Sequence, residues 1–152
     1  FIAYYPHPKS CIYKLNSSIK LQQLGENNYT VKSLKPSEVP SALKRLDAGF
    51  LLRDNLPLNI VSSPTKICEY LAAGVPVICT PYSGDYSRSV QTGRTGYVFI
   101  DYPEILESDI ERLLCYLIKV KSERDYYSKL CIEAASRRTF DKEYENLTNM
   151  IN

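Results

Sequence analysis

Residues 62–79 constrain the fold of this chain more than any other stretch, because they combine a helix start, a helix stop and a strand. Ser63 is placed to cap the helix, and Pro64 can take its first position, where a missing N–H costs nothing. Gly74 suits the left-handed residue that follows a helix. The apolar segment 75–79 then predicts a short buried strand, with Pro76 near its beginning.

The start of this helix is a candidate site for an anion. Free N–H groups and the positive end of the helix dipole point outward there, and Lys66 adds a positive charge. Glu69 lies three residues further on, so its side chain and that of Lys66 share one face. The same spacing also fits a plain surface ion pair, so spacing alone leaves both interpretations open.

Strand-like and helical segments alternate along the chain, which predicts one α/β domain over residues 1–152. We expect a Rossmann-like three-layer sandwich whose sheet has five parallel strands, followed by C-terminal helices. The continuous apolar run at 48–52 indicates a strand covered on both faces. The expected strand order is 29–34, 1–5, 48–53, 75–79, 96–100.

The spacing of apolar residues predicts helices in much of the remaining chain. Ile12, Leu15 and Ile19 predict a helix within residues 9–24. Ser108 and Glu111 form a capping-box pattern before a long apolar stripe. Asp141 is expected to begin the last helix.

Composition excludes several classes of protein. A net charge of +2 is too small to indicate nucleic-acid binding, and 44% hydrophobic with 24% charged residues is typical of a globular chain. No apolar run approaches the roughly 18 residues of a membrane span, and no signal peptide opens the chain.

The cysteines and the single histidine indicate no metal site. The five cysteines show no C-x-x-C spacing, and most of them stand at apolar-periodic positions, so they are interpreted as small core residues in a reducing cytoplasm. His7 stands between two prolines and is interpreted as a loop residue. We expect no metal and no cofactor.

Basic and aromatic residues give two further hypotheses. The first concerns a set of basic residues, namely Lys119, Lys121, Arg124, Arg137 and Arg138. We favour the interpretation that they form a solvated helix face over the alternative that they contact the inner face of an anionic membrane. The second hypothesis is that tyrosines near the expected functional edge stack on a base or sugar; these are Tyr82, Tyr86 and Tyr97.

Parallel sheets bind ligands beyond the carboxyl ends of their strands. The loops expected at that edge are 6–9, 35–37, 53–63 and 80–85. The helix start at 63–66 therefore falls on the functional edge, which favours the ligand interpretation of Lys66 and Glu69.

The segment from Gly49 to Ile78 resembles the C-terminal half of retaining GT-B glycosyltransferases, the group 1 sugar-nucleotide enzymes. The likeness rests on G-F-L-L-R at 49–53 and on S-P-T-K-I-x-E-Y-L-A-A-G-V-P-V-I at 63–78. It implies transfer of a sugar from a nucleotide diphosphate sugar, the donor substrate, to a saccharide or a lipid-linked acceptor with retention of anomeric configuration.

The resemblance also implies residue roles. Glu69 matches the carboxylate that holds the ribose hydroxyls, and residues 62–66 (Ser62, Ser63, Pro64, Thr65 and Lys66) match the stretch that faces the donor's sugar and diphosphate. Arg53 and Lys66 are the candidate catalytic residues, because cations there neutralise charge on the departing diphosphate. Leu34 and Lys35 match the segment whose backbone meets the base.

Three departures from the family pattern stand out. Val61 takes the place of the first glutamate of the family motif, and Asn59 is a candidate replacement for its sugar contact. Residues 62–64 replace the usual glycine-rich stretch. The family's first strand and helix, and its N-terminal acceptor domain, are missing, so we expect a truncated donor-binding domain that is inactive as a transferase by itself.

Two alternatives stay open. A sugar-nucleotide epimerase shares the GT-B architecture but needs acid–base carboxylates and a histidine, which His7 alone fits poorly. A flavodoxin-like or receiver-like binding module needs a phosphate loop or acidic residues after the first strand, where Tyr4, Tyr5 and Pro6 stand instead. The chain has no G-x-G-x-x-G motif, which argues against a dinucleotide site.

Overall fold

A computed structural model describes residues 2–5 and 30–139, with side chains over 34–139. The chain divides into two compact units, Phe1–Ala42 and Leu43–Asn152, and each is described by itself. The predictions for a helix within residues 9–24, for His7, for Cys11 and for a helix from Asp141 lie outside the described residues.

The first unit holds a pair of parallel strands. β1 (Ile2–Tyr5) lies beside β2 (Thr30–Ser33), with Ile2 opposite Thr30. A short 3-10 helix, η2 (Pro36–Glu38), follows β2. It leads into α3 (Val39–Leu43), which crosses the boundary to the second unit.

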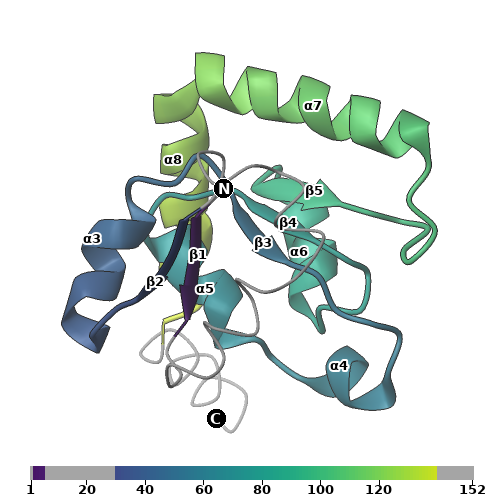
Figure 1. Cartoon of the computed structure of the whole chain (residues 1–152), viewed down its shortest axis with the longest axis horizontal. Helices are drawn as coiled ribbons and strands as arrows, with labels where there is room; N and C mark the ends of the chain where they lie inside the picture. Colours follow the sequence, from purple (N-terminus) through teal and green to yellow (C-terminus); the bar gives the residue numbers. More distant parts are fainter. Residues whose placement is uncertain (1, 6–29, 140–152) are drawn as a thin grey trace, which may run out of the picture. The chain divides into compact units, whose positions relative to one another are not determined.

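The second unit is built on a parallel sheet of three strands (Figure 1). β3 (Gly49–Leu51), β4 (Val77–Cys79) and β5 (Gly96–Val98) lie in the order β3-β4-β5. Because β4 has a strand on each side, its three residues are all fully buried. The strand predicted at 75–79 is found at 77–79, and its place between the other two strands of this sheet agrees with the expected order.

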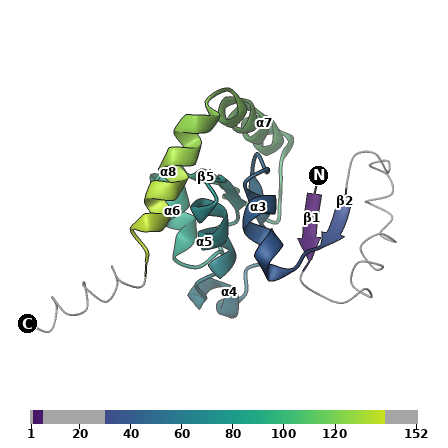
Figure 2. The same ribbon diagram turned by 90° about the vertical axis from the view of Figure 1, so that its left-hand side faces the viewer.

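Helices cover both faces of this sheet (Figure 2). The helices of the unit after α3 are α4 (Pro57–Val61), α5 (Thr65–Ala72), α6 (Tyr86–Thr92), α7 (Glu107–Ser122) and α8 (Arg124–Ser136). Two hydrophobic clusters define these layers. Helices α5, α6 and α8 pack on the sheet face that carries Val77 and Cys79, and α7 packs on the face that carries Ile78. Among the described residues, no helix combines the length and the apolar character that crossing a bilayer requires.

The prediction of a single five-stranded sheet is wrong. The described strands form a pair, β1-β2, and a separate sheet of three, β3-β4-β5. The run at 48–52 is also not a strand covered on both faces, because Phe50 is 42% exposed on β3, which lies at the edge of its sheet. An apolar run predicts that a segment forms a strand, but it does not predict which distant strand it pairs with, because pairing depends on the rest of the chain.

Helix α5 lies directly on β3 and ends as predicted. A Cβ atom on Gly49 would lie 2.6 Å from ring carbons of Tyr70, so only glycine allows this close approach. Gly74 has φ +74°, and its N–H donates to the carbonyl of Leu71 at 2.9 Å. The glycine stop inferred from the sequence is therefore confirmed.

Helix α7 begins one residue before the predicted capping box, and another side chain caps it. The N–H of Leu106 donates to Oδ2 of Asp109 at 3.0 Å, and Arg112 donates to Oδ1 of the same carboxylate at 2.5 Å. These hydrogen bonds lower the pKa of Asp109. The predicted box of Ser108 and Glu111 lies two residues after the real one, which is formed by Leu106 and Asp109.

The hydroxyl of Tyr116 on α7 gives a stability prediction. It is buried and has no hydrogen-bond partner among the described residues, and burial raises the pKa of the phenol. Because an unpaired buried hydroxyl costs about 1–3 kcal/mol, Tyr116→Phe is expected to raise the free energy of unfolding by about 1 kcal/mol in urea denaturation. Tyr126→Phe, on a half-exposed ring, is the control and should change it by less than about 0.5 kcal/mol. A Tyr116→Phe protein less stable than wild type would contradict the prediction.

Candidate functional site

Two loops meet at the carboxyl edge of the three-stranded sheet, and Thr80 ties them together. The N–H of Arg53, just after β3, donates to Oγ1 of Thr80 at 3.1 Å, and the Thr80 hydroxyl donates to the carbonyl of Arg53 at 2.7 Å. Thr80 follows β4 and is fully buried. The backbone of Arg53 is therefore fixed by the neighbouring strand end, independently of its own side chain.

The side chain of Arg53 turns toward the segment that leads into α5. Its Nη1 donates to the hydroxyl of Ser62, which donates in turn to the carbonyl of Asn59 at 3.0 Å. Arg53 is half-buried, and no carboxylate within the described residues forms an ion pair with it. A guanidinium carries five N–H donors, so Arg53 retains donors and a full positive charge for an anion.

Gly84 packs the loop after β4 against the same segment. Its φ is +65°, and a Cβ atom there would lie 1.8 Å from the carbonyl oxygen of Ser62. Both facts require glycine, because other residues strain at this φ and would collide with the backbone. The loop of residues 80–85 thus sets the position of Ser62, the partner of Arg53.

Helix α5 presents an uncapped start at this edge. The helix begins at Thr65, its N-cap residue is Pro64, and no side chain of residues 34–139 caps it. The prediction that Ser63 is the N-cap is therefore wrong by one residue: Ser63 precedes the cap and is exposed. Within the part of the chain that the structure describes, the first N–H groups of α5 consequently have no side-chain acceptor, which suits an incoming anion. We call Arg53, Ser62 and residues 63–66 the edge cluster.

Lys66 and Glu69 share one face of α5, as their spacing predicted. Nζ of Lys66 lies 3.0 Å from Oε2 of Glu69, with the two side chains 50% and 42% exposed. Burial and the nearby Glu69 charge raise the pKa of Tyr70. The pair uses one carboxylate oxygen, which leaves Oε1 of Glu69 as an acceptor for a further group.

The loop between Arg53 and Ser62 holds a helix that the sequence did not indicate. Residues 57–61 form α4, and Val61, at the place of the family's first glutamate, is 81% exposed. Asn59, the candidate replacement for the sugar contact, uses its Nδ2 to donate to the carbonyl of Asp54 at 2.9 Å.

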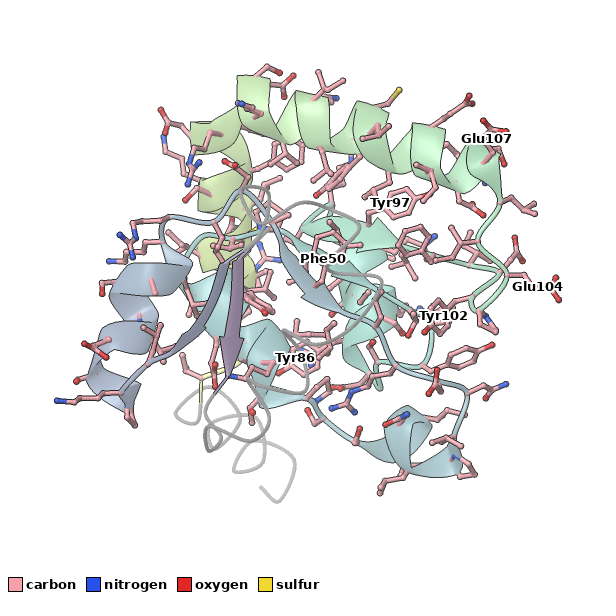
Figure 3. All side chains as sticks on the ribbon, viewed as in Figure 1. Phe50, Tyr86, Tyr97, Tyr102, Glu104 and Glu107 are labelled. Atoms are coloured by element: carbon pink, nitrogen blue, oxygen red, sulfur yellow. The ribbon has the colours of Figure 1, made fainter. Side chains whose placement is uncertain are left out.

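Asp54 also contacts the segment that follows β5. Its carboxylate accepts from the hydroxyl of Tyr102 at 3.4 Å, and Figure 3 shows Tyr102 on that segment.

Leu34 and Lys35, the residues expected near the base, belong to the first unit. There the N–H of Lys35 donates to Oε2 of Glu38 at 2.7 Å and closes the turn before α3. The expectation that these two residues lie near the base stays a prediction.

Two of the three tyrosines considered for stacking are engaged in the core. Tyr86 is buried; its hydroxyl lies 2.5 Å from Sγ of Cys68, and Cζ of Arg138 lies 4.3 Å from its ring centre. Tyr97 packs edge-on against Phe99 with ring centres 5.2 Å apart. Tyr86 and Tyr97, labelled in Figure 3, therefore serve packing, and the stacking hypothesis is retained for Tyr82 alone.

Sequence reasoning missed Thr80 and Gly84, which position the edge cluster. The only signal was the loop expected at 80–85, which marked an irregular segment at the functional edge without showing what it contacts. Asp85 is the N-cap residue of α6 and forms an ion pair with Arg138 at 2.7 Å. Within residues 34–139, no group of three or more His, Cys, Asp or Glu side chains could hold a metal ion.

Comparison of the chain with protein-family models, with curated proteins and with solved structures finds no match.

Proposed function

We propose that this chain is the donor-binding part of a retaining glycosyltransferase of the group 1 GT-B type, and that it holds a nucleotide diphosphate sugar at the edge cluster. The observation that carries the proposal is Arg53, a half-buried guanidinium with a serine partner and no carboxylate partner in the described part of the chain. It lies at the carboxyl edge of a parallel sheet, where such sheets bind ligands.

The diphosphate is assigned to the space served by Arg53 and the start of α5. A guanidinium binds phosphate oxygens through two parallel hydrogen bonds, and the uncapped N–H groups of α5 add donors with the favourable end of a dipole. Lys66 supplies a second cation, since an ammonium group has three donors and only one faces Glu69.

The ribose is assigned to Glu69. A carboxylate can accept hydrogen bonds from two neighbouring hydroxyls, and Oε1 of Glu69 carries no hydrogen bond among the described residues. Its ion pair with Lys66 is exposed and therefore weak enough, at about 0–1 kcal/mol, to rearrange when a ligand binds.

In the reaction, the chain's role is stabilisation of the leaving group. As the bond between the sugar and the diphosphate breaks, negative charge grows on the departing phosphate oxygens. Arg53 and Lys66 are the candidate catalytic residues because fixed cations lower the energy of that charge. The acceptor, its activating groups and the saccharide or lipid-linked product are assigned to the N-terminal domain of a complete enzyme. A cytoplasmic location belongs to the same proposal and is supported by the free, fully buried thiols of Cys79 and Cys131.

A thermal-shift screen against uridine, guanosine, adenosine and cytidine diphosphates and their sugars tests the proposal. A ligand present at 100 times its dissociation constant adds about 2.7 kcal/mol of stability, which raises the melting temperature by several degrees. We expect one base to stand out. The absence of a shift with all four diphosphates at millimolar concentration would contradict the proposal.

Glu69→Ala is expected to weaken binding of the preferred nucleoside diphosphate at least about tenfold, because it removes the ribose acceptor, while the melting temperature without ligand stays nearly unchanged. Titration calorimetry measures the affinity. Glu133→Ala is the matched control: it removes an exposed carboxylate from an ion pair, here with Arg137 at the end of α8. Equal affinity for wild type and Glu69→Ala would remove the ribose role from Glu69 without touching the role of Arg53.

A further inference from the structure

Helix α7 carries a second apolar row, exposed to solvent beside the side that packs on the core. Its inner side packs on the core through Leu113 and Val120, which are buried. On the outer side, Ile110, Leu114 and Ile118 recur every four residues and are 42%, 52% and 69% exposed. In Figures 1 and 2, α7 forms the outermost layer of its unit, with no other labelled helix of that unit lying outside it. Isolated apolar residues are common on surfaces, but a row of three along one helix indicates an interaction face.

Two opposite charges bracket this row at equal distances from its centre. Glu107 lies seven residues before Leu114, and Lys121 lies seven residues after it. Because seven residues make nearly two turns, these three side chains lie almost in line along the helix, with Ile110 and Ile118 on either side of the line. Both charged side chains are exposed, and neither forms an ion pair within the described residues. Figure 3 shows Glu107 at the outer end of α7.

We propose that α7 is the contact of a symmetric homodimer in which two copies of this helix pack antiparallel about a twofold axis at Leu114. A twofold axis places Ile110 opposite Ile118 of the partner subunit and Glu107 opposite Lys121 of the partner subunit, twice over. The apolar row of one subunit is thereby covered by the same row of the partner subunit, and each charged side chain at its ends lies opposite a side chain of opposite charge. Antiparallel helices that pack at about 20° keep such a line in contact along its length.

Other occupants fit this face less well. A parallel arrangement of two copies would set Glu107 against Glu107 of the partner subunit and Lys121 against Lys121 of the partner subunit. An anionic membrane would be repelled by the acidic first half of α7, where Glu107 and Glu111 are exposed, and by the exposed Glu104 just before the helix. The pattern of charges is complementary to itself, which selects a second copy of this chain.

The contact is small, so the dimer is expected to be weak. A 16-residue helix is about 24 Å long, and one helix pair buries less than the roughly 800 Å² per partner of a standard interface. We expect self-association at concentrations on the order of 10–100 µM, visible in sedimentation equilibrium of the whole chain.

Charge exchange tests the arrangement. Each single variant, Glu107→Lys or Lys121→Glu, is expected to weaken self-association at least about tenfold, because it creates two like-charge contacts. The double variant E107K/K121E restores the opposite-charge contacts and is expected to dimerise like wild type. An equimolar mixture of the two single variants is expected to form a heterodimer for the same reason.

Lys119→Glu is the matched control, since it makes the same charge change on α7 outside the row and is expected to leave self-association unchanged. A wild-type chain that stays monomeric at about 500 µM overturns the proposal. So does a dimer that neither single variant weakens, or a pair of weakened single variants that the double variant and the mixture both fail to rescue.

Discussion

Replacing Arg53 by alanine is expected to weaken binding of the preferred nucleoside diphosphate by about 10- to 100-fold. A hydrogen bond to a charged group contributes about 1.5–3 kcal/mol, and each 1.4 kcal/mol is a factor of ten in affinity. Stability should change little, because Thr80 holds the backbone of Arg53 through two hydrogen bonds that the substitution leaves in place. Titration calorimetry measures the affinity, and urea denaturation measures the stability.

Two comparisons separate phosphate binding from a general effect of charge. Arg45→Ala removes the same charge from an exposed residue before β3, at the opposite edge of the sheet, and should leave the affinity unchanged. Arg53→Lys keeps the charge but loses the planar fork, so an intermediate affinity is expected. If Arg45→Ala weakens binding as much as Arg53→Ala does, the effect is long-range electrostatics and the assignment of the diphosphate to Arg53 is wrong.

Gly84→Ala is expected to lower the free energy of unfolding by about 3 kcal/mol and the melting temperature by roughly 10 °C. The left-handed φ of +65° costs an alanine about 1–2 kcal/mol. The rest comes from the new Cβ atom, which would lie 1.8 Å from the carbonyl oxygen of Ser62 and must push the two loops apart. Nucleotide binding should fall as well, because Ser62 is the partner of Arg53.

Gly84→Asn tells the two causes apart. Asparagine tolerates a positive φ better than alanine does, but it carries the same Cβ atom. If contact with Ser62 dominates, Asn should recover less than about 1 kcal/mol of the loss. Near-complete recovery by Asn would mean that the loop of residues 80–85 does not lie against Ser62, and the edge cluster would lose its support.

Local patterns in the sequence predicted the parts of the fold that depend on neighbouring residues. The helix at 65–72, its stop at Gly74 and the strand at 77–79 were all recognisable, because helix ends and short buried strands have strong residue preferences. The ion pair of Lys66 with Glu69 followed from helical spacing for the same reason.

These local patterns could not predict contacts between residues that are distant in the sequence. The split of the strands into β1-β2 and β3-β4-β5 depends on pairing, which residue type does not encode. Thr80 binds the backbone of Arg53 across 27 residues of sequence, and Gly84 touches Ser62 across 22. Of the candidate site, the sequence therefore predicted the charged residues but neither the side chain that fixes Arg53 nor the glycine that lets the loops meet.

An amide-resolved NMR titration of the chain with the best nucleoside diphosphate from the thermal-shift screen tests the proposed site most directly. A saturable ligand is predicted to shift the backbone amides of Thr65 and Lys66 and the guanidinium signal of Arg53, with smaller changes in the rest of the sheet. Saturable binding whose shifts lie elsewhere, or no binding at millimolar nucleotide, would contradict the assignment of the diphosphate to the carboxyl edge of β3 and β4.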